Sequence, residues 1–190
     1  MGGADVPVIR TNTDYEEVLR RAQAASGEPL TKYDAGQQLE DADIKKLREG
    51  AAMFEALAAF DPNKADVRFA TGRVYEALGN DERALSEYKA FLRLSGEPKT
   101  QMQVIDQAAA HLWSSRAHFR LRDYKNAAVA AEAAVSLVPS SAINNWAAAS
   151  AYAEMGENQK ALAFIDASLE LDPNLSEAKL LKKMLLSEKK

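Results

Sequence analysis

The sequence predicts an all-α protein built from repeated helical hairpins, and three observations lead to this prediction. The stretch from Tyr75, "YEALGNDERALSEYKAFLRL", recurs from Tyr152 as "YAEMGENQKALAFIDASLEL", with Gly and Ala-Leu at the same offsets. Between the prolines lie stretches rich in Ala, Leu, Glu, Lys and Arg, with apolar residues three and four apart, as in amphipathic helices. Pro62, Pro139 and Pro173 follow such stretches in matching contexts, where a proline stops a helix.

Residues 1–30 are predicted to form an N-terminal arm with one short helix. Thr13 and Glu16 have the spacing of a capping box at the start of a helix that continues to about Ala25. Gly27 and Pro29 are expected to end it. Either this helix or the segment 31–40 packs against a helix at 44–60, and the sequence leaves both alternatives open.

A period of 34 residues divides the rest of the chain. Pro139 and Pro173 are 34 residues apart, and the windows that end shortly after them abut. A third window aligns on Gly79, and a more degenerate fourth contains Pro62 near its end. The predicted units, in order, are 31–64 (degenerate), 65–98, an insertion at 99–107 that lengthens the helix after it, 108–141 and 142–175.

The residues that recur in these windows are those of a helical-hairpin repeat. A small residue, an aromatic, Gly, Ala and Pro stand at the eighth, eleventh, fifteenth, twentieth and thirty-second places. This pattern resembles the tetratricopeptide repeat (TPR). The matching residues are Gly72, Tyr75, Gly79 and Ala84 in the first clear window, Ser115, Ala127 and Pro139 in the second, and Ala149, Tyr152, Gly156, Ala161 and Pro173 in the third. The second window has His118 at the aromatic place, and the first has Gly96 where proline is usual. The resemblance implies a TPR-type solenoid wound as a right-handed superhelix.

The segment 176–190 is predicted to be a C-terminal capping helix, because a stack of repeats needs a polar end. Leu180, Leu181, Met184 and Leu185 form an apolar stripe on it. This stripe is more apolar than a solvated cap requires. It therefore supports an alternative function, a homo-oligomeric assembly module that dimerises through these residues.

Composition excludes several classes of function. The chain has no cysteine, so neither a disulfide nor a cysteine metal site is possible. A net charge of −4 argues against nucleic acid as a partner, and no apolar run is long enough to span a bilayer. The start "MGGADVPVIRTN" lacks the features of a signal peptide. We expect a soluble, cytoplasmic protein, with an exported form whose signal was removed as the alternative.

We expect no catalytic residues, no metal and no cofactor. The sequence has no glycine-rich phosphate loop and no Gly-x-Ser-x-Gly motif. The two histidines, His111 and His118, are seven residues apart on one helix, roughly 10 Å along its axis, which is too far for one tetrahedral ion. The predicted class is therefore a non-catalytic scaffold.

The TPR resemblance also predicts where a partner binds. In this family the second, fifth, sixth, ninth and twelfth places of each first helix line a concave groove. Aromatic side chains beside arginines suit an extended peptide or a helix of a partner protein, possibly acidic. The chaperone-type clamp, with Lys at the fifth and Asn at the ninth place, is not predicted, because Phe69 and Arg73 stand there. The predicted groove residues are Phe69, Arg73, Leu112, Trp113, Arg116, Phe119, Arg120, Ile143, Trp146 and Ser150. The alternative is that Leu112, Trp113 and Phe119 pack under the lengthened helix or the N-terminal arm.

Overall fold

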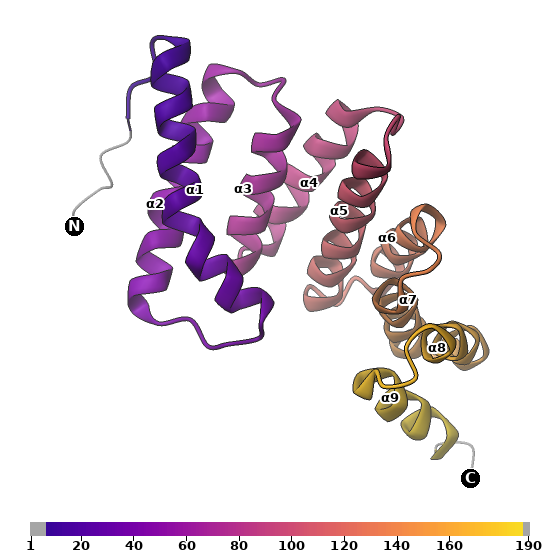
Figure 1. Ribbon diagram of the computed structural model, residues 1–190. Coiled ribbons are helices and arrows are strands. Elements are labelled where there is room, and N and C mark those ends of the chain that lie inside the picture. The colour runs from indigo at the N-terminus through magenta and orange to yellow at the C-terminus, as the bar shows by residue number, and fades with distance from the viewer. Residues whose placement is uncertain (1–6, 188–190) are drawn as a thin grey trace. The chain divides into compact units, whose positions relative to one another are not determined.

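The computed structural model describes residues 7–187, and within this range it consists of α-helices joined by short turns (Figure 1). Residues 1–6 of the predicted arm and residues 188–190 of the predicted capping helix lie outside the described residues. The helices are α1 (Asn12–Asp34), α2 (Asp41–Phe60), α3 (Ala65–Ala77), α4 (Asp81–Ser95), α5 (Gln101–Arg120), α6 (Tyr124–Leu137), α7 (Ala142–Glu154), α8 (Asn158–Leu171) and α9 (Ser176–Ser187).

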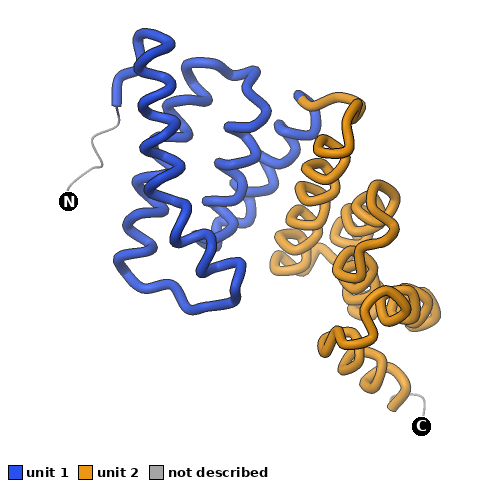
Figure 2. The backbone as a smooth tube through the Cα atoms, viewed as in Figure 1, with its two compact units in different colours: residues 1–94 blue, residues 95–190 orange. Residues whose placement is uncertain are grey.

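The chain divides into two compact units, residues 1–94 and residues 95–190 (Figure 2). In unit 1, α1 pairs with α2, and both contact α3. In unit 2, each helix from α5 to α9 packs against the next one, and α7 also touches α5 and α9. Each unit is thus a stack of antiparallel helical hairpins, as the repeat predicts.

Tight turns of left-handed backbone connect the two helices of a hairpin. Gly79 after α3 and Gly156 after α7 have φ angles of 72° and 73°. A residue without Cβ adopts this conformation without steric cost. Arg122 takes the same turn between α5 and α6, with φ of 59°, and it is one 34-residue period before Gly156. The repeat therefore imposes the turn even where glycine is absent.

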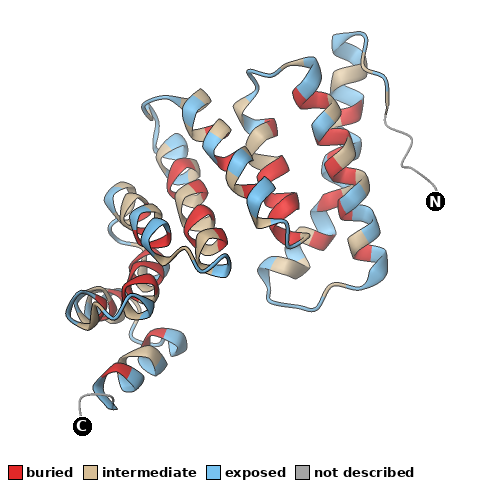
Figure 3. Ribbon diagram, turned by 180° about the vertical axis from the view of Figure 1, so that it is seen from behind, coloured by how far each residue is buried: buried red, intermediate tan, exposed pale blue. Residues whose placement is uncertain are grey.

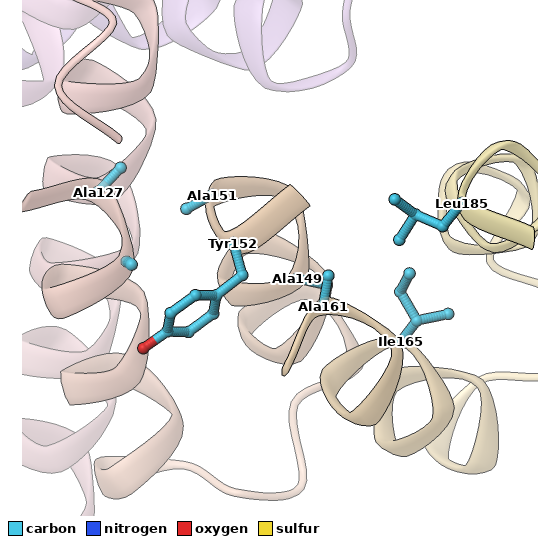
Figure 4. Packing of buried hydrophobic residues seen from close by; sticks show 8 residues of the cluster. Ala127, Ala149, Ala151, Tyr152, Ala161, Ile165 and Leu185 are labelled. Atoms are coloured by element: carbon cyan, nitrogen blue, oxygen red, sulfur yellow. The ribbon is translucent and has the colours of Figure 1, made fainter. Parts of the chain in front are cut away.

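Buried residues lie along the parts of each helix that are next to other helices of the same unit (Figure 3). The core of unit 1 contains large residues such as Leu47, Phe54 and Tyr88. The core of unit 2 is rich in alanine, which lets the helices approach closely (Figure 4). The alanines at the twentieth place of each clear window, Ala84, Ala127 and Ala161, are fully buried.

The N-terminal helix corrects the prediction of a short helix ending near Ala25. Helix α1 continues through Gly27 and Pro29 to Asp34. Tertiary packing overrides the local stop signals: Pro29 is buried, and Lys32 near the helix end forms an ion pair of 3.0 Å with a buried Asp43 in α2. Helix α1 packs against α2, and it contains the first of the two alternative segments and residues 31–34 of the second.

The start of α1 also differs from the prediction. Thr11 is the N-cap, and its hydroxyl accepts a hydrogen bond of 3.1 Å from the Asp14 N–H. The Asp14 carboxylate accepts in return from the Thr11 N–H at 2.9 Å. Aspartate therefore takes the role that the sequence analysis assigned to Glu16, and the capping box lies two residues earlier than the predicted one at Thr13.

Helix α5 has 20 residues, whereas the equivalent helices α3 and α7 have 13 each. Its N-cap is Thr100, whose hydroxyl accepts from the Gln103 N–H at 3.2 Å. Helix α9 begins at Ser176, directly after the last hairpin. In the described part of the chain, every helix is too short or too polar to traverse a bilayer.

Candidate functional site

A cavity of about 320 Å³ lies in unit 2 between α5 and α7. Seven of the ten predicted groove residues line it, and Ser115 and Ala147 complete the wall. Sequence analysis did not place Ser115 in the groove, because the eighth place is not among the groove places that the TPR resemblance implies. The predicted residues in the wall are Leu112, Arg116, Phe119, Arg120, Ile143, Trp146 and Ser150.

The period of the repeat explains why these side chains meet. Helices α5 and α7 are the first helices of consecutive hairpins and contact one another. Leu112 and Trp146 are 34 residues apart and occupy the same place on each, as do Arg116 and Ser150. Equivalent faces of neighbouring helices therefore form one continuous surface.

The cavity wall is mainly apolar and anchored in the core of unit 2. Leu112 packs against the buried Ala131, Ala147 and Ala148. Phe119 also packs inward, and its ring lies 5.3 Å from the Tyr124 ring in an edge-to-face arrangement. These aromatic and aliphatic groups are held by their own unit, so the cavity is preformed rather than assembled by a ligand.

Arginine supplies the charge of the cavity. Among the described residues that line it, the charged ones are Arg116 and Arg120, on a chain whose net charge is −4. Guanidinium groups have a planar fork of N–H donors that matches a carboxylate. The Ser150 hydroxyl instead donates to the Trp146 carbonyl oxygen at 2.9 Å. The site is therefore suited to an anionic group next to apolar ones.

The structure contradicts the predicted role of Arg73. Its side chain is only 8% exposed, and it forms ion pairs with Glu76, at 2.9 Å, and with Asp34. Asp34 reaches it because α1 is longer than predicted. Arg73 thus joins α1 to α3 within unit 1, and it is not exposed to a partner as the sequence analysis expected.

Glu76 is the centre of this buried network. Its carboxylate is fully buried and accepts hydrogen bonds from the Tyr88 hydroxyl at 3.0 Å and the Tyr33 hydroxyl at 3.4 Å. Burial, followed by the charge of Glu76, raises the pKa of Tyr88. Phe69 is half-buried beside it, 4.8 Å from the Phe91 ring. Phe69 therefore packs within unit 1 as well.

Trp113 and the histidines lie outside the cavity wall. Trp113 is half-buried. Burial lowers the pKa of His111, and His118 Nδ1 lies 3.2 Å from the Asp123 carboxylate at the start of α6. Across residues 7–187, no three His, Cys, Asp or Glu side chains are grouped so that they could hold a metal ion.

The apolar stripe of α9 divides into two faces, which corrects the prediction that all of it is available to a second copy. Leu185 is buried and points toward Ile165 of α8 (Figure 4), and Leu181 packs against the same cluster. Leu180 and Met184 are 60% and 51% exposed. The inner pair closes the end of the core, as a capping helix does.

Comparison with known proteins agrees with this fold. A family model described as tetratricopeptide repeat matches residues 144–175. The chain is similar to the crystal structure of MamA, with a TM-score of 0.68 and 19% identity over 80% of this chain and 86% of that one. The chain contains a tetratricopeptide repeat at residues 144–175 and has a TPR-type fold. Its TPR hairpins are also similar to those of TTC0263, a thermophilic TPR protein in Thermus thermophilus (TM-score 0.60, 21% identity, 92% and 88% coverage).

A third similar structure is a TPR domain with a bound peptide. It is the first TPR of Spaghetti (RPAP3) bound to the HSP90 peptide SRMEEVD, with a TM-score of 0.54 and 23% identity over 67% of this chain and 94% of that one. No curated protein sequence matches the chain. At these identities the structural likeness establishes the TPR fold of the chain.

Proposed function

We propose that the chain is a non-catalytic scaffold that binds a segment of a partner protein in the groove of unit 2. The observation that carries this proposal is the cavity between α5 and α7, which is lined by residues that the TPR period predicts to face a groove. Trp146 and Phe119 supply large apolar contacts, and Arg116 supplies donors for a carboxylate. Aromatic and arginine side chains of this kind contribute most of the binding free energy at protein interfaces.

The peptide complex of the similar RPAP3 domain supports a peptide as the type of ligand, since the bound sequence SRMEEVD is acidic. The Lys and Asn of the chaperone-type clamp are absent from the places that Phe69 and Arg73 occupy. Recognition of an acidic group in this chain therefore depends on the arginines of α5, and the selected sequences are expected to differ from those of the clamp.

A pull-down from a lysate of the source cell tests the proposal. Wild type is compared with a double variant, Arg116→Ala with Trp146→Ala, and bound proteins are identified by mass spectrometry. Arg93→Ala with Leu171→Ala is the control, because it also removes one arginine and one large apolar side chain, both outside the cavity. We expect one protein to be retained by wild type and the control, and lost with the groove variant.

Circular dichroism on each variant confirms that its helix content is unchanged. The retained protein is then cut into overlapping peptides, and their binding to wild type is measured by calorimetry. Equal retention by all three proteins would exclude the groove of unit 2 as the binding surface.

A further inference from the structure

The period that builds the cavity continues into the capping helix. Leu112 of α5, Trp146 of α7 and Leu180 of α9 follow one another at intervals of 34 residues. Arg116, Ser150 and Met184 do the same. Helix α9 packs against α7 as α7 packs against α5. The outer face of α9 therefore continues the surface that lines the cavity.

This outer face carries two large apolar side chains, Leu180 and Met184, among exposed charged residues. Leu180 and Met184 are four residues apart on one side of α9 and largely exposed, whereas Ala178 and Leu185 on the other side are buried. Scattered exposed leucines are ordinary on a protein surface. Leu180 and Met184, however, occupy the repeat positions that Trp146 and Ser150 occupy on α7, so this exposed pair continues the groove.

Charge changes along this surface. At α5 the charged side chains of the cavity wall are Arg116 and Arg120, and at α7 the wall is aromatic and aliphatic apart from Ser150. At α9 the places of Leu112 and Arg116 hold Leu180 and Met184, whereas the places of Ser115 and Ile143 hold Lys183 and Glu177. Glu154, which is equivalent to Arg120 on α7, is not among the cavity residues. A carboxylate complements the α5 end, and an apolar group complements the α9 end.

We infer that α9 forms the third wall of the groove, and that the occupant is an extended segment of a partner protein with an acidic residue at one end and large apolar residues at the other. This inference rests on the proposed function. Packed helices lie about 8–10 Å apart, so two intervals from α5 to α9 span about 16–20 Å. An extended chain advances about 3.3 Å per residue, so about six residues cross the groove.

Labelled synthetic peptides test this inference by fluorescence anisotropy. The probe is Glu-Glu-Ala-Trp-Ala-Leu-Leu, with its reversed order as a second probe because either chain direction satisfies the chemistry. Two matched peptides replace both Glu by Gln or both Leu by Ser. We expect one of the two directions to bind, and each matched peptide of that direction to bind about tenfold more weakly.

Protein variants assign each end of the peptide to its wall. The double variant Leu180→Ser with Met184→Ser is expected to weaken binding of the unsubstituted probe about tenfold. It is expected to leave binding of the Ser-substituted peptide unchanged, as a double-mutant cycle requires. Arg116→Gln is expected to weaken binding of the Glu-containing probe about tenfold and to leave binding of the Gln-substituted peptide unchanged. The control is Leu186→Ser, because Leu186 is exposed on another side of α9.

The outcomes separate this inference from the proposed function. If the Arg116→Gln variant loses binding while the α9 double variant keeps it, the groove function stands and the third wall is refuted. If neither probe direction binds, the proposed ligand pattern is wrong. A dimer in light scattering that the α9 double variant abolishes would identify the occupant as a second copy of the chain, which also overturns the inference.

Discussion

The Tyr152 hydroxyl donates a hydrogen bond of 2.7 Å to the carboxylate of Glu132, 20 residues earlier in the chain. This bond joins the second helix of one hairpin, α6, to the first helix of the next, α7. Tyr75 and Glu55 make the same connection between α3 and α2, again over 20 residues. The repeat thus reproduces a side-chain bond between hairpins as well as a backbone fold.

Each of these tyrosines also has a cation on its ring. Lys160 Nζ lies 4.7 Å from the centroid of the Tyr152 ring, and the Arg83 guanidinium lies 5.0 Å from that of Tyr75. Both cations follow their tyrosine by eight residues, at the start of the next helix. Such contacts add about 0.5–1 kcal/mol at exposed sites.

Removing one hydroxyl is therefore expected to weaken one junction between hairpins. Tyr152→Phe keeps the ring and its cation contact but loses the bond to Glu132, at a cost of about 1 kcal/mol in the free energy of unfolding. Urea denaturation measures the change. Tyr124→Phe is the control, expected within about 0.5 kcal/mol of wild type because Tyr124 is half-exposed and its hydroxyl makes no such bond to another described residue. Equal losses in the two variants would contradict this role of the bond.

The same bonds are expected to delay ionisation of two tyrosines. The hydrogen bond to Glu132, then burial, raises the pKa of Tyr152 to about 12. Burial, then the bond to Glu55, raises the pKa of Tyr75 to about 12. Because the folded state holds these protons more tightly, the associated stability is complete below about pH 10 and declines as the pH rises from there through about 12.

Ultraviolet difference absorbance of the phenolate measures these titrations. Glu132→Gln removes the charge that opposes ionisation, so the Tyr152 pKa is expected to fall toward its ordinary value of 10.0. Glu55→Gln is expected to have a smaller effect on Tyr75, for which burial is the larger cause. A Tyr152 pKa that stays near 12 in Glu132→Gln would show that the charge of Glu132 does not control it.

Arg122→Gly is expected to stabilise the protein. Arg122 has a left-handed φ of 59° at a turn where the equivalent residue of the next hairpin is Gly156. The left-handed conformation costs about 1–2 kcal/mol for a residue with a side chain, and part of the gain is offset by the greater freedom of glycine in the unfolded chain. We expect a net increase of roughly 0.5–1 kcal/mol in the free energy of unfolding, measured with urea. Gly156→Ala provides the opposite comparison and is expected to destabilise by about 1 kcal/mol, although its Cβ would meet no atom within 4 Å.

Two helical glycines are expected to respond in opposite directions to alanine. A Cβ on Gly72 would lie 2.5 Å from Cε1 of the fully buried Tyr88, so Gly72→Ala is expected to cost about 1–3 kcal/mol through overpacking. A Cβ on Gly27 of α1 would meet nothing within 4 Å, and alanine favours the helix there by about 0.5–1 kcal/mol. Calorimetric unfolding of both variants checks the pair, and a stabilised Gly72→Ala would contradict the packing of Tyr88 against α3.

The hairpin period, its glycine turns and most of the residues around the cavity follow from the sequence alone. Leu112, Trp146 and Ser150 could be placed together because a fixed period puts equivalent residues of neighbouring helices on the same face. Such a pattern depends only on the spacing of residues along the chain, so it can be recognised without knowing the rest of the fold.

Which segments pack against each helix face, in contrast, depends on the tertiary structure. Packing against α2 carries α1 through Pro29 to Asp34, and Asp34 then binds Arg73, which the period had assigned to a partner. Packing on α8 likewise buries Leu185 and leaves Met184 exposed, although both belong to one apolar stripe. The physical reason is that burial and ion pairing depend on segments distant in the chain, and their free energies exceed the local helix preferences that a sequence pattern displays.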